Sequence, residues 1–330
     1  MENMDTPKSY PAIEPFATHM LAVGDGHTLY LEESGHLQGI PVIFLHGGPG
    51  SYCKPQHRCF FNPRHYRIIL FDQRGAGRST PAGNIQHNTT QHLLTDMETI
   101  RQYLGIDNWL VFGGSWGATL GLLYALTYPE RVLGLILRGT FLARQHDLTW
   151  FYHHNGVARL FPQYWEAFTN FKFLTEKCAY PPVKKGEVAD LLSTYNYLLR
   201  DDTPQAHQAA LAWSNWEGTV ISMAQFPRLT EPTLELLHAA RVACHYISNN
   251  CFIEDNIILQ QATARLAHIP TQLIHGQQDL ICPLESAYQL HQALPHSQLM
   301  VLPNSGHLSS DPAMFNALVQ ATDSFLQQQG

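Results

Sequence analysis

Three residues far apart in the chain, Ser115, Asp279 and His307, are the strongest candidates for chemistry. A serine hydroxyl is a poor nucleophile until an imidazole removes its proton, and a carboxylate fixes the tautomer of that imidazole and stabilises its charged form. Singly, Asp279 would equally serve as a helix cap, and His307 is one of 19 histidines. Together, in the order serine, aspartate, histidine, they predict nucleophilic catalysis through a covalent acyl-enzyme intermediate.

The residues around Ser115 predict a sharp turn from a strand into a helix. An apolar run at 109–112 leads into Gly113-Gly-Ser-Trp-Gly117, and a helix-like run follows as far as residue 128. Glycines two positions before and after a serine permit a tight turn that lifts its hydroxyl out of the sheet. The same turn places the amide of Trp116 at a helix N-terminus, where it can stabilise a developing oxyanion.

Asp279 and His307 are each expected just beyond a short strand. Strands at 271–275 and 298–302 precede them, and the loop that carries His307 leads into a helical stretch from Asp311 onward. Ligand sites of open α/β sheets lie at the carboxyl ends of the strands. Asp279 and His307 are therefore expected at the same edge of the sheet as Ser115.

A second oxyanion donor is expected after the strand at 41–45. The following loop, His46-Gly-Gly-Pro-Gly50, is like the glycine-rich loops that supply an N–H group in this kind of site. Gly48 is the expected donor, with Gly47 as the alternative, because a residue without a Cβ lets the backbone approach the substrate carbonyl. A plain turn would use the same Gly-Pro-Gly, whereas a phosphate-binding loop is excluded because no Gly-Lys-Ser/Thr follows.

These motifs resemble the proline iminopeptidases (prolyl aminopeptidases), a family of the α/β-hydrolase superfamily. The resemblance runs from about residue 10 to the C-terminus, and its motifs are 46–50, 72–79, 113–121, 138–141, 150–152, 159–162, 213–218 and 279–283. It implies a serine exopeptidase that releases an N-terminal proline from peptides, with a helical cap whose acidic residues hold the free amine of the substrate. Small peptides with a free N-terminal proline are the implied partners.

The resemblance also implies roles for individual residues. Ser115, Asp279 and His307 match the catalytic triad, and Glu217 matches one of two amine-binding glutamates. The residues that match the family's proline pocket are Phe141, Phe151, Tyr152, Ile247 and Cys282.

One position departs from the family pattern. Where the family carries its second amine-binding glutamate, this chain has Ala243. An α-amino group has an unperturbed pKa of about 8 and needs a negative partner when it is desolvated. Either Glu254, Asp255 or another acid of the cap compensates, or selectivity for the amine is relaxed.

The departure keeps other functions open. An esterase or amidase would use the same triad on a neutral acyl substrate, and a ligand-binding protein would keep the fold without turnover. An epoxide hydrolase is disfavoured because those relatives use aspartate where this chain has Ser115.

The composition is that of an ordinary water-soluble globular protein. Hydrophobic residues make up 45% of the 330, and the formal net charge is −7 without a basic block, so nucleic acid is not an expected partner. The N-terminal residues lack the basic start and apolar core of a secretory signal, and no apolar run is long enough to span a membrane, so we expect a cytoplasmic protein. The sequence does not fix its oligomeric state.

We expect neither a metal nor a cofactor. The six cysteines form no Cys-x-x-Cys pair, which favours free thiols. His153 and His154 are adjacent, so on a helix they point in different directions, and no His-Glu-x-x-His pattern is present.

The apolar pattern along the chain predicts an α/β fold of the α/β-hydrolase type, with a mainly parallel, doubly wound sheet. A hairpin at 18–34 turns at Asp25-Gly26, further strands are expected at 67–71 and 133–137, and Asn88-Thr-Thr can cap a helix that ends at Gly105. Between 142 and 265 the strand rhythm stops, which predicts a helical cap inserted into a catalytic core of 1–141 and 266–330.

Overall fold

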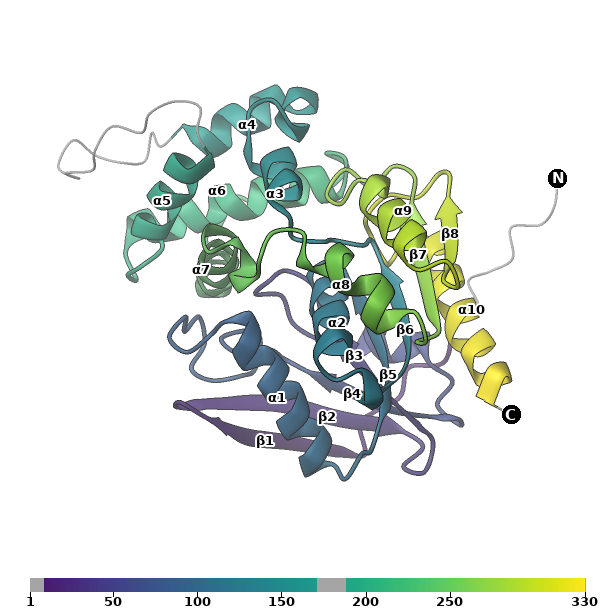
Figure 1. Ribbon diagram of the computed structural model, residues 1–330. Helices are drawn as coiled ribbons and strands as arrows, with labels where there is room; N and C mark the ends of the chain where they lie inside the picture. The colour runs from purple at the N-terminus through teal and green to yellow at the C-terminus, as the bar shows by residue number, and fades with distance from the viewer. Residues whose placement is uncertain (1–8, 171–187, 330) are drawn as a thin grey trace.

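The computed structural model describes residues 9–170 and 188–329, and Cys178 and the pair Pro181-Pro182 lie outside these ranges. Eight strands form one sheet in the order β1-β2-β4-β3-β5-β6-β7-β8 (Figure 1). The strands are β1 (Ala17–Gly24), β2 (His27–Gly35), β3 (Ile40–Leu45), β4 (Tyr66–Phe71), β5 (Trp109–Gly114), β6 (Val132–Arg138), β7 (Thr271–Gly276) and β8 (Gln298–Leu302). The prediction of a mainly parallel sheet is confirmed, because only the pairs β1–β2 and β2–β4 are antiparallel.

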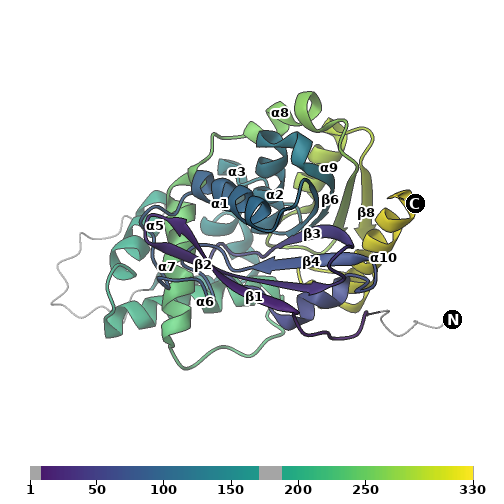
Figure 2. The same cartoon turned by 90° about the horizontal axis from the view of Figure 1, so that it is seen from below.

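Strands β3 to β6 are apolar because both faces of the sheet are covered. The helices α1 (Thr90–Tyr103), α2 (Trp116–Thr127), α8 (Ile257–Leu266) and α9 (Leu284–Ala293) share one apolar core on the first face. On the opposite face, α10 (Pro312–Gln329) packs with the short 3-10 helix η1 (Pro55–Phe60). Figure 2 shows α1, α2 and α8 together on one side of the sheet.

The predicted hairpin and the predicted helices before and after β5 agree with the structure. Strands β1 and β2 pair around Asp25 and Gly26, and α2 ends at Thr127, ahead of Pro129. Thr89 occupies the N-cap position of α1, but its hydroxyl contacts the ring of His92 instead of a backbone amide.

A group of helices between β6 and β7 lies beyond the carboxyl edge of the sheet (Figure 1). These helices are α3 (Gln145–Tyr152), α4 (Pro162–Thr169), α5 (Val188–Leu198), α6 (Pro204–Ile221) and α7 (Leu234–Ser248). Their shared core is aromatic: the rings of Phe168 and Tyr195 stack 4.8 Å apart, and those of Phe168 and Trp216 stack 5.6 Å apart.

The helix α8 belongs structurally to the sheet side of the molecule. It packs on α2 and α9, and its buried Ile258, Ala262 and Leu266 join the core beneath the sheet. We therefore propose that the cap ends before α8, earlier than the boundary at residue 265 that the sequence pattern predicts.

No helix in the described ranges is both long and apolar enough to cross a membrane. The five cysteines that the structure describes are free thiols, four of them buried.

Candidate active site

Ser115 lies at the turn between β5 and α2, in a backbone conformation that is rare for a residue with a side chain. Its φ is 58° and its ψ is −123°, and its N–H donates to the carbonyl of Arg138 at 2.9 Å. The flanking glycines are required by packing, because a Cβ on Gly113 would clash with the carbonyl of Gly117, and one on Gly117 would clash with that of Leu45. A strained turn of this kind persists only where its surroundings enforce it, which is common at catalytic sites.

Asp279 and His307 are brought together from two loops at the carboxyl ends of β7 and β8. The Nδ1 atom of His307 lies 2.7 Å from Oδ2 of Asp279, and both residues are buried. The amides of Ile281 and Cys282 donate to the other carboxylate oxygen, at 3.0 and 2.9 Å. The aspartate is thus fixed on one side by its own loop and presents the other side to the imidazole.

The pKa of the Asp279 carboxyl lies below its ordinary value despite burial. Burial by itself raises this pKa. The charge and hydrogen bond of His307, together with His275 and the Cys282 amide, lower it by more than burial raises it. The carboxylate therefore stays ionised at neutral pH. This is the state that stabilises an imidazolium at His307.

Ser115 and His307 line one cavity of about 900 Å³. The thiol of Cys282 lies beside them. Burial and the charge of Asp279 raise the pKa of this thiol well above its ordinary value, whereas the charge of Arg138 and a hydrogen bond to Ser115 oppose that shift. The three residues predicted to form a triad thus belong to one site, because Ser115 and His307 share the cavity and Asp279 pairs with His307.

The predicted oxyanion donors lie on both sides of Ser115. Gly47 and Gly48 line the cavity, and a Cβ on Gly47 would lie 3.6 Å from that of Ser115. The amide of Trp116 is the first of helix α2, where no residue of the same helix can accept its hydrogen bond. Its indole points elsewhere and donates to the side chain of Gln73 at 2.9 Å, so only the backbone of Trp116 is available to a substrate.

The residues matched to the proline pocket line the same cavity, and so does Glu217, which was matched to an amine-binding glutamate. The pocket residues are Phe141, Phe151, Tyr152, Ile247 and Cys282. On α6, Trp213 and Trp216 are buried in the cap, whereas Ser214, Glu217 and Ile221 line the cavity. The helical period of 3.6 residues thus separates a packing face from a cavity face, which directs Glu217 toward the site.

Glu217 has an unusual electrostatic environment. Burial raises the pKa of its carboxyl to about 7, and the polar side-chain groups of Trp213 and of Tyr152, whose hydroxyl lies 3.5 Å away, oppose that shift. Of the other acids that line the cavity, Asp147 is paired with Arg144 at 2.8 Å, and Glu235 is exposed. Glu217 is therefore the acid of this cavity best placed to accept a cationic ligand.

Ala243 lies on the cavity side of α7. Its neighbours one turn away, Ala240 and Ile247, both line the cavity, so a longer side chain at 243 would point the same way. The suggested substitutes do not lie there: Glu254 is exposed, and Asp255 accepts a hydrogen bond from the amide of Gln145 at 2.8 Å. Neither is among the described residues that line the cavity.

Two supporting residues were not predicted from the sequence. His275 accepts a hydrogen bond from the amide of Thr140 at 3.2 Å and donates to the carbonyl of Cys282 at 2.7 Å, which fixes the Asp279 loop. Arg138 donates to the carbonyl of His307. Each residue lies at the carboxyl end of its strand, and this position is the sequence signal that could have identified it as part of the site.

The cap is tied directly to the loop that carries the acid. The indole N–H of Trp150 on α3 donates to the carbonyl of Leu280 at 2.9 Å. Arg144, just before α3, donates to the hydroxyl of Ser286 on α9 at 3.0 Å.

The eight-stranded sheet, the strained serine between β5 and α2 and the paired aspartate and histidine define an α/β hydrolase. Residues 40–312 match the family model for the alpha/beta hydrolase fold. Among solved structures, the chain is similar to MGS-M2, an alpha/beta hydrolase enzyme from a deep-sea metagenome (TM-score 0.61, 16% identity, 93% of this chain and 97% of the other). It is also similar to epoxide hydrolase VrEH1 from Vigna radiata (TM-score 0.57, 17% identity, 94% and 98%).

Closer relatives refine this assignment. The chain is 45% identical to a probable proline iminopeptidase from Leptolyngbya boryana over 97% of both chains. It is 44% identical to the proline iminopeptidase of Xanthomonas citri, covering 96% of this chain and 98% of the relative, and 40% identical to that of Neisseria gonorrhoeae, with the same coverage. The chain belongs to the proline iminopeptidase family.

Proposed function

We propose that this protein is a serine aminopeptidase that releases an N-terminal proline from small peptides. One observation carries the proposal: a single cavity holds Ser115 and His307 and also Glu217, an acid with no cationic partner among the described residues. A nucleophile and an amine-binding carboxylate in one enclosed space suit a substrate whose free amine lies close to the bond that is cut.

In the proposed reaction, the hydroxyl oxygen of Ser115 attacks the carbonyl carbon of the first residue while His307 takes the hydroxyl proton. The negative charge on the carbonyl oxygen is held by the amides of Gly48, or Gly47, and Trp116. The C–N bond then breaks, and His307 gives its proton to the departing amine of the shortened peptide. Water, deprotonated by His307, hydrolyses the acyl-enzyme and restores Ser115.

Selectivity is proposed to come from the cap. The ionised carboxylate of Glu217 pairs with the substrate amine, and the aromatic side chains of Phe141, Phe151 and Tyr152 enclose an apolar ring. Because the cap helices lie beyond the carboxyl edge of the sheet (Figure 1), where β5 leads into Ser115, we expect the cap to exclude long or folded chains. The cytoplasmic location expected from the sequence stays a prediction.

Hydrolysis of proline p-nitroanilide tests this function, with Ser115→Ala as the variant and N-acetylproline p-nitroanilide as the matched substrate. We expect rapid release of p-nitroaniline from the free amine, much slower release from the acetylated substrate, and no measurable release by the Ser115→Ala variant. Equal turnover of the two substrates would defeat the aminopeptidase assignment.

The second candidate is an esterase or amidase with relaxed selectivity for the amine. The observation that favours it is Ala243, which places a methyl group where the family carries its second glutamate. A panel of acyl esters and amides without a free amine separates the two functions, because an esterase would turn these over at least as fast as proline p-nitroanilide.

A further inference from the structure

A second group of chemically capable side chains lies outside the catalytic cavity, between the β1–β2 turn and the start of α1. Within residues 9–170 and 188–329, two groups of three potential metal ligands have ligand atoms within 4.8 Å of one another. One is Asp279, Cys282 and His307 of the catalytic site. The other is Asp25, His87 and His92, none of which lines the catalytic cavity.

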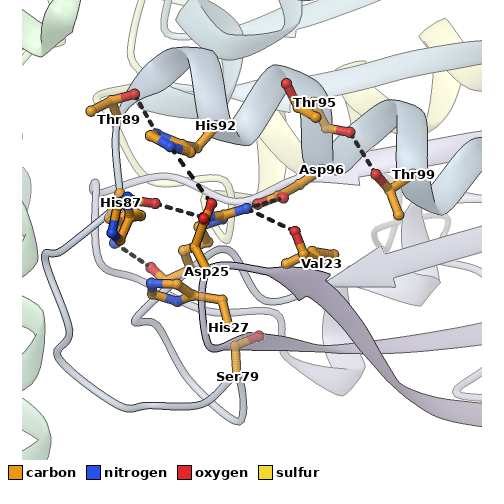
Figure 3. A network of polar contacts seen from close by, with 12 residues as sticks. Val23, Asp25, His27, Ser79, His87, Thr89, His92, Thr95, Asp96 and Thr99 are labelled. Atoms are coloured by element: carbon orange, nitrogen blue, oxygen red, sulfur yellow. Dashed lines mark hydrogen bonds and ion pairs between the residues drawn. The ribbon is translucent and has the colours of Figure 1, made fainter.

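The fold brings these three residues together from separate elements (Figure 3). Asp25 is in the turn between β1 and β2, His87 is in the loop before α1, and His92 is in the first turn of α1. The Nε2 atom of His92 lies 3.9 Å from a carboxylate oxygen of Asp25, and the ring centres of His87 and His92 are 6.0 Å apart. All three side chains are exposed or half-buried, so an ion can reach them from solvent.

The ring of His92 is oriented by Thr89. The hydroxyl of Thr89 lies 2.8 Å from Nδ1 of His92. When Nδ1–H donates to that hydroxyl, Nε2 carries the lone pair and faces Asp25. Metal-binding histidines are held in this way, with the second ring nitrogen donating to a nearby oxygen.

The loop that carries His87 is also held in place. The carbonyl of His87 accepts a hydrogen bond from Arg74 at 2.6 Å, and the preceding carbonyl, of Gln86, accepts one from His27 at 2.8 Å. His87 has a φ of 49°, which is uncommon for a residue with a Cβ and is stabilised by these two contacts. The ligand geometry is thus partly built before any ion binds.

The positive charge of the nearby Arg74 guanidinium is compensated by the carboxylate of Asp96. Both carboxylate oxygens of Asp96 accept hydrogen bonds from it, at 2.8 and 2.7 Å, and both residues are buried. Its contact with Asp25 is longer, at 3.4 Å. Asp25 can therefore turn toward a bound cation at the loss of one weak contact.

We propose that Asp25, His87 and His92 bind a divalent transition-metal ion of the Zn²⁺ type, with water as the fourth ligand. Two imidazoles and one carboxylate are ligands that Zn²⁺ accepts in tetrahedral geometry, at about 2.0–2.1 Å. Those bond lengths place the ligand atoms about 3.4 Å apart, so the exposed side chains need only modest rotation. The bound ion joins the β1–β2 turn to the start of α1. The predicted absence of a metal rested on local spacing, which such a site does not show.

Titration calorimetry of the chelator-treated, full-length protein with ZnCl₂ tests the proposal. We expect saturable binding that is lost in the His87→Ala/His92→Ala double variant. The matched control is His153→Ala/His154→Ala, which removes two adjacent histidines elsewhere and should leave the binding unchanged. Equal Zn²⁺ affinity in the wild type and the His87→Ala/His92→Ala variant would overturn the proposal.

Two further measurements separate this site from the catalytic one. Asp25→Asn keeps a side chain that tolerates the left-handed φ of 52° but removes the charge, and it should weaken Zn²⁺ binding at least about tenfold. Unchanged affinity would contradict the role of Asp25. Zn²⁺ bound at the catalytic group instead, through His307 and Cys282, would inhibit hydrolysis and would contradict the proposed site. In metal-free buffer, the His87→Ala/His92→Ala variant should keep wild-type hydrolysis.

Discussion

Replacing Glu217 by glutamine removes a charge from the cavity while keeping the size of the side chain. Tyr152 contacts one carboxylate oxygen, and glutamine retains an oxygen that can accept this hydrogen bond. The change therefore isolates the charge. A charge-assisted hydrogen bond contributes about 1.5–3 kcal/mol, which corresponds to about a ten- to hundredfold fall in kcat/KM for proline p-nitroanilide.

The pH dependence makes this prediction sharper. Because the pKa of Glu217 is raised to about 7, its carboxylate is half ionised at pH 7 and largely ionised at pH 8. At pH 6 only about a tenth of it is ionised, so the wild type loses most of the advantage that the charge provides. The ratio of wild-type to variant kcat/KM should therefore rise from pH 6 to pH 8.

The assay is initial-rate hydrolysis of proline p-nitroanilide and N-acetylproline p-nitroanilide by both proteins, at several pH values. The acetylated substrate carries no amine charge and should show little difference between wild type and variant. An equal loss on both substrates, or a loss that does not change with pH, would refute the pairing of Glu217 with the amine.

Three further outcomes follow from the same geometry. Ala243→Glu adds an acid on the cavity side of α7 and should raise kcat/KM for proline p-nitroanilide about tenfold without helping the acetylated substrate; no gain would place residue 243 out of reach of the amine. Gly139→Ala adds a Cβ at a φ of 54°, 3.2 Å from the Asp279 carboxylate and 3.3 Å from Nδ1 of His307, and should lower kcat about ten- to a hundredfold, whereas wild-type kcat would contradict this steric argument. The Glu217→Gln variant should also differ in stability: the native carboxyl holds its proton up to about pH 7, above its ordinary value of 4.5, so wild-type stability falls as pH rises through this window. The melting temperature of the variant relative to the wild type should be higher at pH 8 than at pH 5, and a constant difference would contradict the raised pKa.

Local sequence patterns predict the sheet because each strand is defined by its own apolar residues. The hairpin at Asp25-Gly26, the buried strands and the glycine-flanked Ser115 all have signals within a few residues. The packing of α8 had no such signal, since an amphipathic helix does not show whether its partner is the cap or α2. The pattern therefore predicts the order of the elements, whereas the end of the cap depends on packing that local patterns do not show.

The supporting residues of the site depend on neighbours that are distant in sequence. His275 gains its role from the amide of Thr140, and Arg138 from the carbonyl of His307. Neither partner is recognisable before the strands are aligned in the sheet. The same is true of Asp25, His87 and His92, which no short motif connects.

The hydrogen bond from Trp150 to the carbonyl of Leu280 means that the cap and the loop that carries Asp279 are not independent modules. A chimera that received the cap of another hydrolase would lose this anchor next to Asp279, and with it part of the alignment of the acid. We therefore expect the substrate range of this fold to change more readily through single substitutions on the cavity faces of α6 and α7 than through exchange of the whole cap.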